Sequence, residues 1–168
     1  MLYVDWYDGD YILPPMGQAR DQGAAVYLNL ESRYQDAALL SRLAPLADIC
    51  QVSMAEPEAG GGVDDVVDLV LAAGCETVAV TMGRDGCVVA GSKERLRLPA
   101  PAVKVVDATG AGDVFAAAYL IRFQESGDPL VAARFASAAA SFCVEADGVE
   151  GIPTRAQVED RLWTRRGR

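Results

Sequence analysis

The residues best suited to catalytic chemistry lie in one short run, Asp107-Ala108-Thr109-Gly110-Ala111-Gly112-Asp113. Gly110 and Gly112 have no Cβ, so the backbone there can approach a ligand closely. The alanine-rich stretch that follows predicts a helix, and the amides at the start of a helix attract an anion. Asp113 adds a carboxylate beside those amides. Amides that hold a phosphate, next to a carboxylate that accepts a proton, are what phosphoryl transfer to a hydroxyl requires.

A simpler interpretation of the same run stays open at this point. Acidic residues are common in the first turns of helices, and short glycine patterns also occur in plain connections between a strand and a helix. Val105 and Val106 precede the run, and such β-branched residues predict a strand over 104–106. The alternatives are therefore an anion site between a strand and a helix, or a tight turn that binds nothing.

Two further polar loops follow predicted strands. Residues 76–81 predict a strand that leads into Thr81-Met82-Gly83-Arg84-Asp85-Gly86, with a hydroxyl and two glycines. A plain hairpin turn is the alternative for this loop. Residues 48–52 predict another strand, which is followed by Ser53-Met54-Ala55-Glu56. Glu56 is either part of a site or an acidic residue on a solvated loop.

The remaining predicted elements alternate along the chain. Strands are predicted at residues 2–7, 24–30, 87–90 and 95–98, and helices at 14–22, 37–46, 63–73, from the glycine-rich run to about 126, at 128–145 and after 154. This alternation indicates an α/β fold with a mostly parallel sheet covered on both faces. Ligands bind beyond the carboxyl ends of such strands, so the loops after Val52, Thr81 and Val106 are expected to converge on one ligand.

Composition narrows the functional classes. The 168 residues predict a single domain, 1–168, and the formal net charge of -9 argues against a nucleic-acid partner or an anionic membrane surface. The chain has no histidine, which excludes Ser-His-Asp and Cys-His catalysis. The four cysteines are scattered, which indicates neither a zinc site nor a disulfide framework. No apolar run reaches transmembrane length, and a cytoplasmic location is expected.

The run from Asp107 to Asp113 resembles the second signature of the ribokinase (PfkB) family of carbohydrate and nucleoside kinases. The resemblance implies a three-layer α/β/α fold with a doubly wound, ribokinase-like sheet. It also implies ATP-dependent phosphoryl transfer to a hydroxyl of a sugar or nucleoside. In that reading Asp113 is the general base, and the amides of Gly110, Ala111 and Gly112 form the anion hole.

The family's other motifs imply a nucleotide site. The loop from Thr81 to Gly86 fits the family pattern Thr-x-Gly-x-x-Gly, which implies ATP phosphate contacts at Thr81, Gly83, Arg84, Gly86 and Gly112. Ser53 and Glu56 resemble the family's Asn-x-x-Glu motif, with Glu56 associated with Mg²⁺. Ser53 replaces the asparagine, and its hydroxyl is shorter and has fewer donors than an amide. Ser137 falls where relatives place a residue beside adenine, although the alanines around it equally indicate close helix packing.

A monovalent cation, K⁺, is a further implication of the resemblance. Asp107 and Thr109 would contribute oxygens to it, and the carbonyls of Cys143, Ala146 and Gly148 would complete the shell. Because backbone carbonyls come from any residue type, the sequence itself adds little to this assignment.

Only the second half of the family pattern is present. The first half, with the sugar-binding residues and a small lid, is expected to be absent, so self-association or pairing with a missing N-terminal half is expected. A non-catalytic nucleotide-binding or interaction module stays open as an alternative. A dinucleotide-binding oxidoreductase is less favoured, because Phe115 stands where its fingerprint needs a third glycine.

Overall fold

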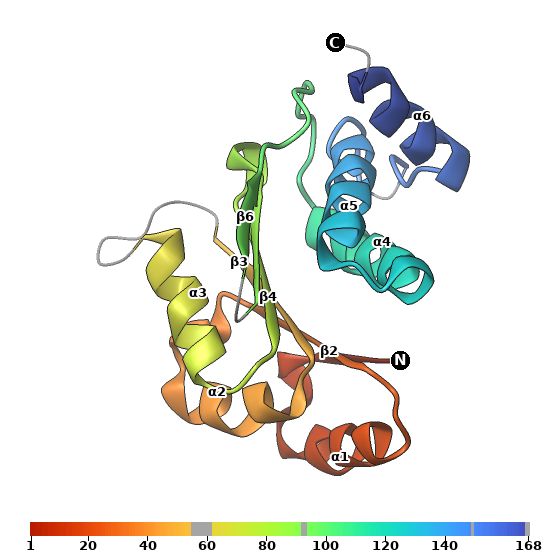
Figure 1. The fold of residues 1–168 in the computed structure, drawn as a ribbon. Coiled ribbons are helices and arrows are strands. Elements are labelled where there is room, and N and C mark those ends of the chain that lie inside the picture. Colours follow the sequence, from red (N-terminus) through yellow and green to blue (C-terminus); the bar gives the residue numbers. More distant parts are fainter. Residues whose placement is uncertain (55–61, 92–93, 149, 167–168) are drawn as a thin grey trace. The chain divides into compact units, whose positions relative to one another are not determined.

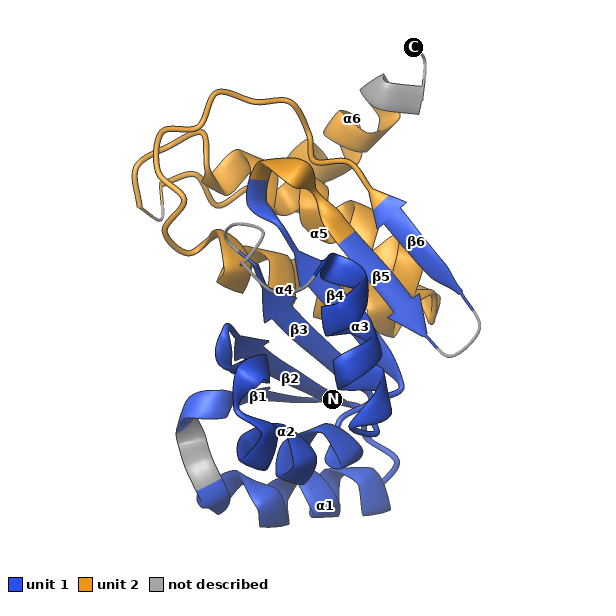
Figure 2. Cartoon of the chain, turned by 90° about the vertical axis from the view of Figure 1, so that its left-hand side faces the viewer, with its two compact units in different colours: residues 1–83, 88–97 blue, residues 84–87, 98–168 orange. Residues whose placement is uncertain are grey.

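The computed structural model describes residues 1–54, 62–91, 94–148 and 150–166. The chain divides into two compact units (Figure 2). The first unit contains residues 1–83 and 88–97, and the second contains residues 84–87 and 98–168. No observation tests the prediction that 1–168 is one domain, so it stays a prediction.

A six-stranded sheet whose strands follow their order in the chain is the centre of the first unit. Its strands are β1 (Leu2–Asp5), β2 (Val26–Glu31), β3 (Ile49–Ser53), β4 (Thr77–Thr81), β5 (Cys87–Gly91) and β6 (Arg95–Leu98). The first four strands pair in parallel, whereas β5 and β6 run in opposite directions (Figure 2). The α/β fold with a mostly parallel sheet is confirmed.

The helices between the parallel strands supply the first unit's core (Figure 1). They are α1 (Leu13–Asp21), α2 (Ala37–Leu43) and α3 (Val63–Ala72), with 3₁₀ turns at Trp6–Ile12, Arg33–Gln35, Ala44–Leu46 and Gly83–Asp85. On α3 the buried valines recur at helical spacing, at Val63, Val66, Val67 and Val70. They join alternate strand residues in one apolar cluster. Each such buried side chain contributes about 1.5–3 kcal/mol relative to exposure.

The second unit contains three helices in its described part, α4 (Ala111–Ser126), α5 (Pro129–Cys143) and α6 (Arg155–Arg166). Helices α4 and α5 pack against each other. Buried alanines of α5 permit this close approach; they are Ala132, Ala133, Ala136, Ala138 and Ala139. Arg155 of α6 pairs with Glu125 of α4, and Arg161 pairs with Glu145, two residues beyond the end of α5.

One predicted element is wrong. Residues 104–106 form no strand in the described chain. Val105 and Val106 are each 59 % exposed. The amide of Val106 donates to the carbonyl of Val144, 2.7 Å away and just beyond α5. The segment therefore pairs with the end of a helix, and no neighbouring strand takes its hydrogen bonds.

None of the described helices combines the length and the apolar character needed to cross a membrane.

Candidate functional site

The glycine-rich run forms a tight turn that leads into α4. The amide of Ala111 donates to the carbonyl of Ala108 at 3.2 Å. Gly110 between them has φ 76° and ψ -2°, the values of the third residue of a type II turn. A Cβ at Gly110 would meet no atom within 4 Å. Glycine is therefore favoured here by the left-handed backbone conformation, and the space beside it is open.

Asp107 fixes the geometry of this turn. Its Oδ1 accepts hydrogen bonds from the amide and the hydroxyl of Thr109, at 2.9 and 2.8 Å. Its Oδ2 accepts from the amide of Gly148 at 3.0 Å. The Thr109 bonds, with a further contribution from Gly148, hold the pKa of the Asp107 carboxyl below its usual value. A charged carboxylate thus ties the turn to the loop that follows α5.

Of the residues expected for a monovalent cation, Thr109 and Gly148 donate hydrogen bonds to Asp107, and Cys143 lies beside both of them. The thiol of Cys143 lies 3.6 Å from the carbonyl oxygen of Thr109 and 4.0 Å from that of Gly148. The carbonyl of Cys143 accepts from the amide of Ala146 at 3.3 Å. Burial, with the nearby charges of Asp107 and Asp113, raises the pKa of the Cys143 thiol. A carboxylate and converging carbonyls are a donor set that fits K⁺.

Asp113 is the third residue of α4 and its side chain is exposed. The first bond within the helix runs from the amide of Val114 to the carbonyl of Gly110 at 2.9 Å. Within the described residues no ion pair engages the Asp113 carboxylate. A carboxylate in this position can accept a proton from a group bound at the helix start.

In the first unit, the ends of β3 and β4 bring two predicted site residues side by side. Ser53 and Thr81 are register partners, and the Thr81 hydroxyl lies 3.3 Å from that of Ser53 and 3.2 Å from the carbonyl of Val52. The amide of Met54 donates to the carbonyl of Thr81 at 2.8 Å. The prediction that these two loops leave the same edge of the sheet is confirmed. The segment before Asp107 is not a strand. The expectation that ligand-binding loops follow the carboxyl ends of parallel strands therefore does not apply to it.

The two glycines of the Thr81–Gly86 loop differ in whether a side chain would fit at their positions. Gly83 is exposed with φ 54°, and a Cβ there would meet nothing within 4 Å. Gly86 is buried with φ 90°, and a Cβ there would overlap the carbonyl of Leu98 and lie 2.7 Å from the amide nitrogen of Ala100. Packing against the end of β6 and the residues that follow it therefore requires Gly86, a reason that the sequence motif does not reveal. Arg84, between the two glycines, is exposed.

Ser137 and Glu56 complete the predicted nucleotide residues. Ser137, on α5, has its hydroxyl 3.5 Å from the thiol of Cys87, whose pKa is raised by burial. Its neighbours Ala136 and Ala138 are buried in helix packing. Glu56 lies outside the described residues. Within the part of the chain that is described, no three His, Cys, Asp or Glu side chains gather as a metal site.

Two buried amide side chains in the sheet were missed by the sequence analysis. Asn29 and Gln51 are register partners on β2 and β3, and they are 2 % and 0 % exposed. The Tyr27 hydroxyl donates to Oε1 of Gln51 at 2.5 Å. The available signal was an amide side chain among the mostly apolar residues of each strand.

Comparisons with known proteins place this geometry in a family. The sequence model of the pfkB family carbohydrate kinases matches residues 15–155. The chain belongs to the pfkB family. Ribokinase of Bacillus subtilis is 46% identical over 85 residues, which are 49% of this chain and 29% of that protein.

Solved structures of pfkB-family proteins have the same fold. Ribokinase of Thermotoga maritima superposes with a TM-score of 0.80 at 24% identity, over 96% of this chain and 56% of that one. Aminoimidazole riboside kinase of Salmonella enterica, solved with aminoimidazole riboside and an ATP analogue, gives 0.77 at 28% identity, over 89% and 56%. The pfkB-family chain thus spans little more than half the length of these two structures.

Proposed function

We propose that this pfkB-family chain carries the phosphoryl-transfer site of a carbohydrate kinase, which moves a phosphoryl group from ATP to a hydroxyl of a sugar or nucleoside. The observation that carries the proposal is the exposed carboxylate of Asp113, three residues beyond the left-handed Gly110 turn. The similarity to ribokinase and to a riboside kinase solved with an ATP analogue supports it.

The reaction assigns a role to each group at the start of α4. Asp113 accepts the proton of the acceptor hydroxyl while that oxygen attacks the γ-phosphorus, and the bond from phosphorus to the ADP oxygen breaks. The amides of Gly110, Ala111 and Gly112 stabilise the charge on the moving phosphoryl group. The Ala111 amide already has a 3.2 Å bond to Ala108. A charged phosphoryl oxygen is the stronger acceptor and would displace that carbonyl.

The nucleotide contacts are assigned to two sets of residues. Thr81, Gly83, Arg84, Gly86 and Ser53 would hold the phosphates, together with Gly112, and Ser137 would lie beside the adenine. The proximity of the Ser53 and Thr81 hydroxyls supports the first set. The open space at Gly83 supports a close approach of phosphate there.

Cations would be held by oxygen donors. Glu56 would hold Mg²⁺ together with the phosphates, and Mg²⁺ would neutralise charge that develops on the transferred group. Asp107, Thr109, Cys143, Ala146 and Gly148 would hold K⁺ near the start of α4. The convergence of the Thr109 and Gly148 carbonyls on one thiol supports this assignment.

A non-catalytic nucleotide-binding or interaction module is the second candidate. The chain spans 56% of the length of each of the two solved relatives described above. Under this candidate the chain binds nucleotide weakly and phosphorylates free sugars poorly or not at all. β1 is one of the two edge strands of the described sheet, and such edges are normally covered. We therefore propose self-association, or pairing with the N-terminal half of a full-length relative.

Two measurements on the same sample separate the candidates. A coupled assay of ADP release with ATP, Mg²⁺ and a panel of sugars and nucleosides tests catalysis, and calorimetry with a non-hydrolysable ATP analogue tests binding. Each is repeated after adding the N-terminal half of a relative as a separate chain, with sedimentation to follow association. Turnover supports the kinase, and binding without turnover in either condition supports the module. Loss of both would contradict both candidates.

A further inference from the structure

The side chain of Cys143 has no role in the proposed reaction, which uses only the carbonyl of this residue. Cys143 ends α5 and is 1 % exposed. Its Sγ lies 3.6 Å from the carbonyl oxygen of Thr109 and 4.0 Å from that of Gly148. All three residues belong to the second unit. The thiol therefore faces two of the oxygens that the proposed function assigns to K⁺.

These oxygens already have hydrogen-bond donors within the protein. A thiol is a weak donor, and at a carbonyl oxygen a donor hydrogen presents positive charge to the lone pairs that a cation would use. A third assigned oxygen, the carbonyl of Cys143, accepts from the amide of Ala146 at 3.3 Å. A cation at this place would therefore compete with donors of the chain itself.

The carboxylate of Asp107 is also supplied with donors. An ionised carboxylate has about four acceptor sites. The amide and the hydroxyl of Thr109 and the amide of Gly148 each donate to it, at 2.9, 2.8 and 3.0 Å. The amide of Val106 adds a bond to the carbonyl of Val144 at 2.7 Å. Protein groups thus join the glycine-rich turn to the end of α5 and to the loop after it.

The sulfur of Cys143 lies in a confined place. The loop after α5 passes so close to the helix end that a Cβ at Gly151 would lie 2.6 Å from the carbonyl oxygen of Phe142 and 2.8 Å from that of Cys143. Because protein interiors are packed with few voids, a cation that binds the carbonyls on the side of Sγ must displace the sulfur. The neutral sulfur is no substitute for an oxygen ligand, since hard cations prefer oxygen.

We propose that the Cys143 thiol competes with K⁺ for the carbonyls of Thr109 and Gly148 and takes over its structural role. The pfkB-family chain then binds K⁺ weakly and folds without it. The inference rests on the cation assignment made under the proposed function. Removal of the sulfur, with every assigned oxygen retained, is expected to strengthen K⁺ binding by about tenfold or more.

Thermal melts of the full chain test the inference without any substrate. They are recorded in KCl and in tetramethylammonium chloride, both at about 0.15 M, so that ionic strength is matched. A cation that binds the folded state raises the Tm. The unaltered chain is expected to give Tm values within about 1 °C in the two salts. Cys143→Ala is expected to melt lower in tetramethylammonium chloride and to gain about 2 °C or more in KCl.

Two further variants make the assignment specific. Cys75→Ala is the matched control, because the Cys75 thiol is also buried and donates to a carbonyl, that of Thr77, at 3.1 Å, in the first unit. It is expected to lose stability equally in both salts. Cys143→Ser replaces sulfur by an oxygen that hard cations accept, and it is expected to gain a KCl response too. The serine variant decides the question if Cys143→Ala does not fold.

The outcomes separate this inference from the proposed function. A KCl-specific rise of Tm in the unaltered chain as large as in Cys143→Ala would overturn the inference. Equal Tm values of the folded Cys143 variants in the two salts would overturn it as well, even if ADP release shows the chain to be a kinase. A KCl response confined to the Cys143 variants, in samples without any ADP release, would support the inference while the kinase proposal fails.

Discussion

A glycine in the left-handed conformation flanks helix α4 at each end, but the acidic side chains near the two ends differ in their partners. Gly110 precedes the helix with φ 76°, and Gly127 ends it with φ 64°. A Cβ would meet nothing within 4 Å at either position. At the first end the carboxylate of Asp113 is exposed, whereas at the second end Glu125 is bound by Arg155 at 2.6 Å and by Arg122 at 3.1 Å.

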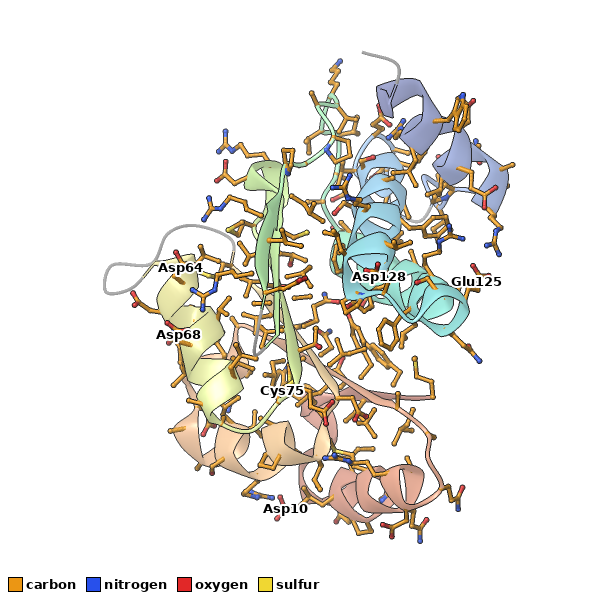
Figure 3. All side chains as sticks on the ribbon, viewed as in Figure 1. Asp10, Asp64, Asp68, Cys75, Glu125 and Asp128 are labelled. Atoms are coloured by element: carbon orange, nitrogen blue, oxygen red, sulfur yellow. The ribbon has the colours of Figure 1, made fainter. Side chains whose placement is uncertain are left out.

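We call the Gly110 end of α4 the open end, because the Asp113 carboxylate is exposed there, and the Gly127 end the closed end, because Glu125 is held there by ion pairs. At the C-terminal end the amide of Gly127 bonds to the carbonyl of Phe123 at 2.8 Å. Asp128, which is labelled together with Glu125 in Figure 3, then caps α5 by accepting from the amides of Leu130 and Val131, at 2.8 and 3.1 Å. Protein groups satisfy this end, so its role is structural. The Gly110 end keeps an acid beside a helix start, the combination that suits a reaction.

The largest effect is expected at the acid of the open end. In a catalytically active form of the protein, Asp113→Asn keeps the shape of the side chain and removes its ability to accept a proton. Turnover is expected to fall by about two to four orders of magnitude, while ATP affinity changes little. Steady-state kinetics together with calorimetry would show both effects. Near-normal turnover of the variant would refute the role of Asp113 as general base.

The next effect concerns the amides of the open end. A valine side chain at Gly112, the second residue of α4, would intrude on a bound phosphate. Gly112→Val is expected to abolish binding of an ATP analogue while the circular-dichroism spectrum stays that of the folded chain. If a folded variant still bound the analogue, these amides would not form the anion site.

A matched pair of substitutions compares the two glycines directly. Gly110→Ala and Gly127→Ala each force a left-handed conformation on alanine, which costs about 1–2 kcal/mol. Similar losses of Tm are expected for the two variants. Only Gly110→Ala is expected to weaken binding of the ATP analogue as well, by about tenfold. Equal analogue binding by both variants would remove the functional distinction between the two ends of α4.

Sequence reasoning predicted the elements whose signals are local. The valines of α3 recur with a helical period, and the Asp128-Pro129 pair begins α5 where a cap and a first-turn proline are expected. It failed at Val105 and Val106, because the carbonyl that pairs with this segment comes from Val144. A propensity for strand does not reveal such a distant partner.

For the candidate site, the sequence indicated which residues are neighbours but not which contacts each residue makes. The family resemblance grouped Asp107, Thr109 and Gly148 as cation ligands, which stays a prediction, and the structure joins the three residues by hydrogen bonds. It could not show that packing against Leu98 requires Gly86. Nor could it show that the side chain of Asn29 is buried. Both depend on atoms far away in the chain.

The smallest effect is expected at the closed end of α4, and it depends on pH. Hydrogen bonds from Arg155, helped by Arg122, lower the pKa of Glu125 from 4.5 to about 2. Since the pKa is lower in the folded state, the carboxylate stabilises the fold above about pH 4.5, and this contribution disappears as the pH falls to about 2. The side chain is 37% exposed, so solvent screens the pair and the contribution is small.

Glu125→Gln is therefore expected to lower the Tm at pH 7 by about 1–2 °C. The difference from the unaltered chain should shrink as the pH falls from 4.5 to 2. Glu150→Gln, at another exposed position of the second unit, is the control and should not change the Tm at pH 7. Thermal melts at several pH values would measure both. A Glu125→Gln difference that stayed constant down to pH 2 would mean that packing of the side chain holds this end of α4, and that its charge contributes nothing.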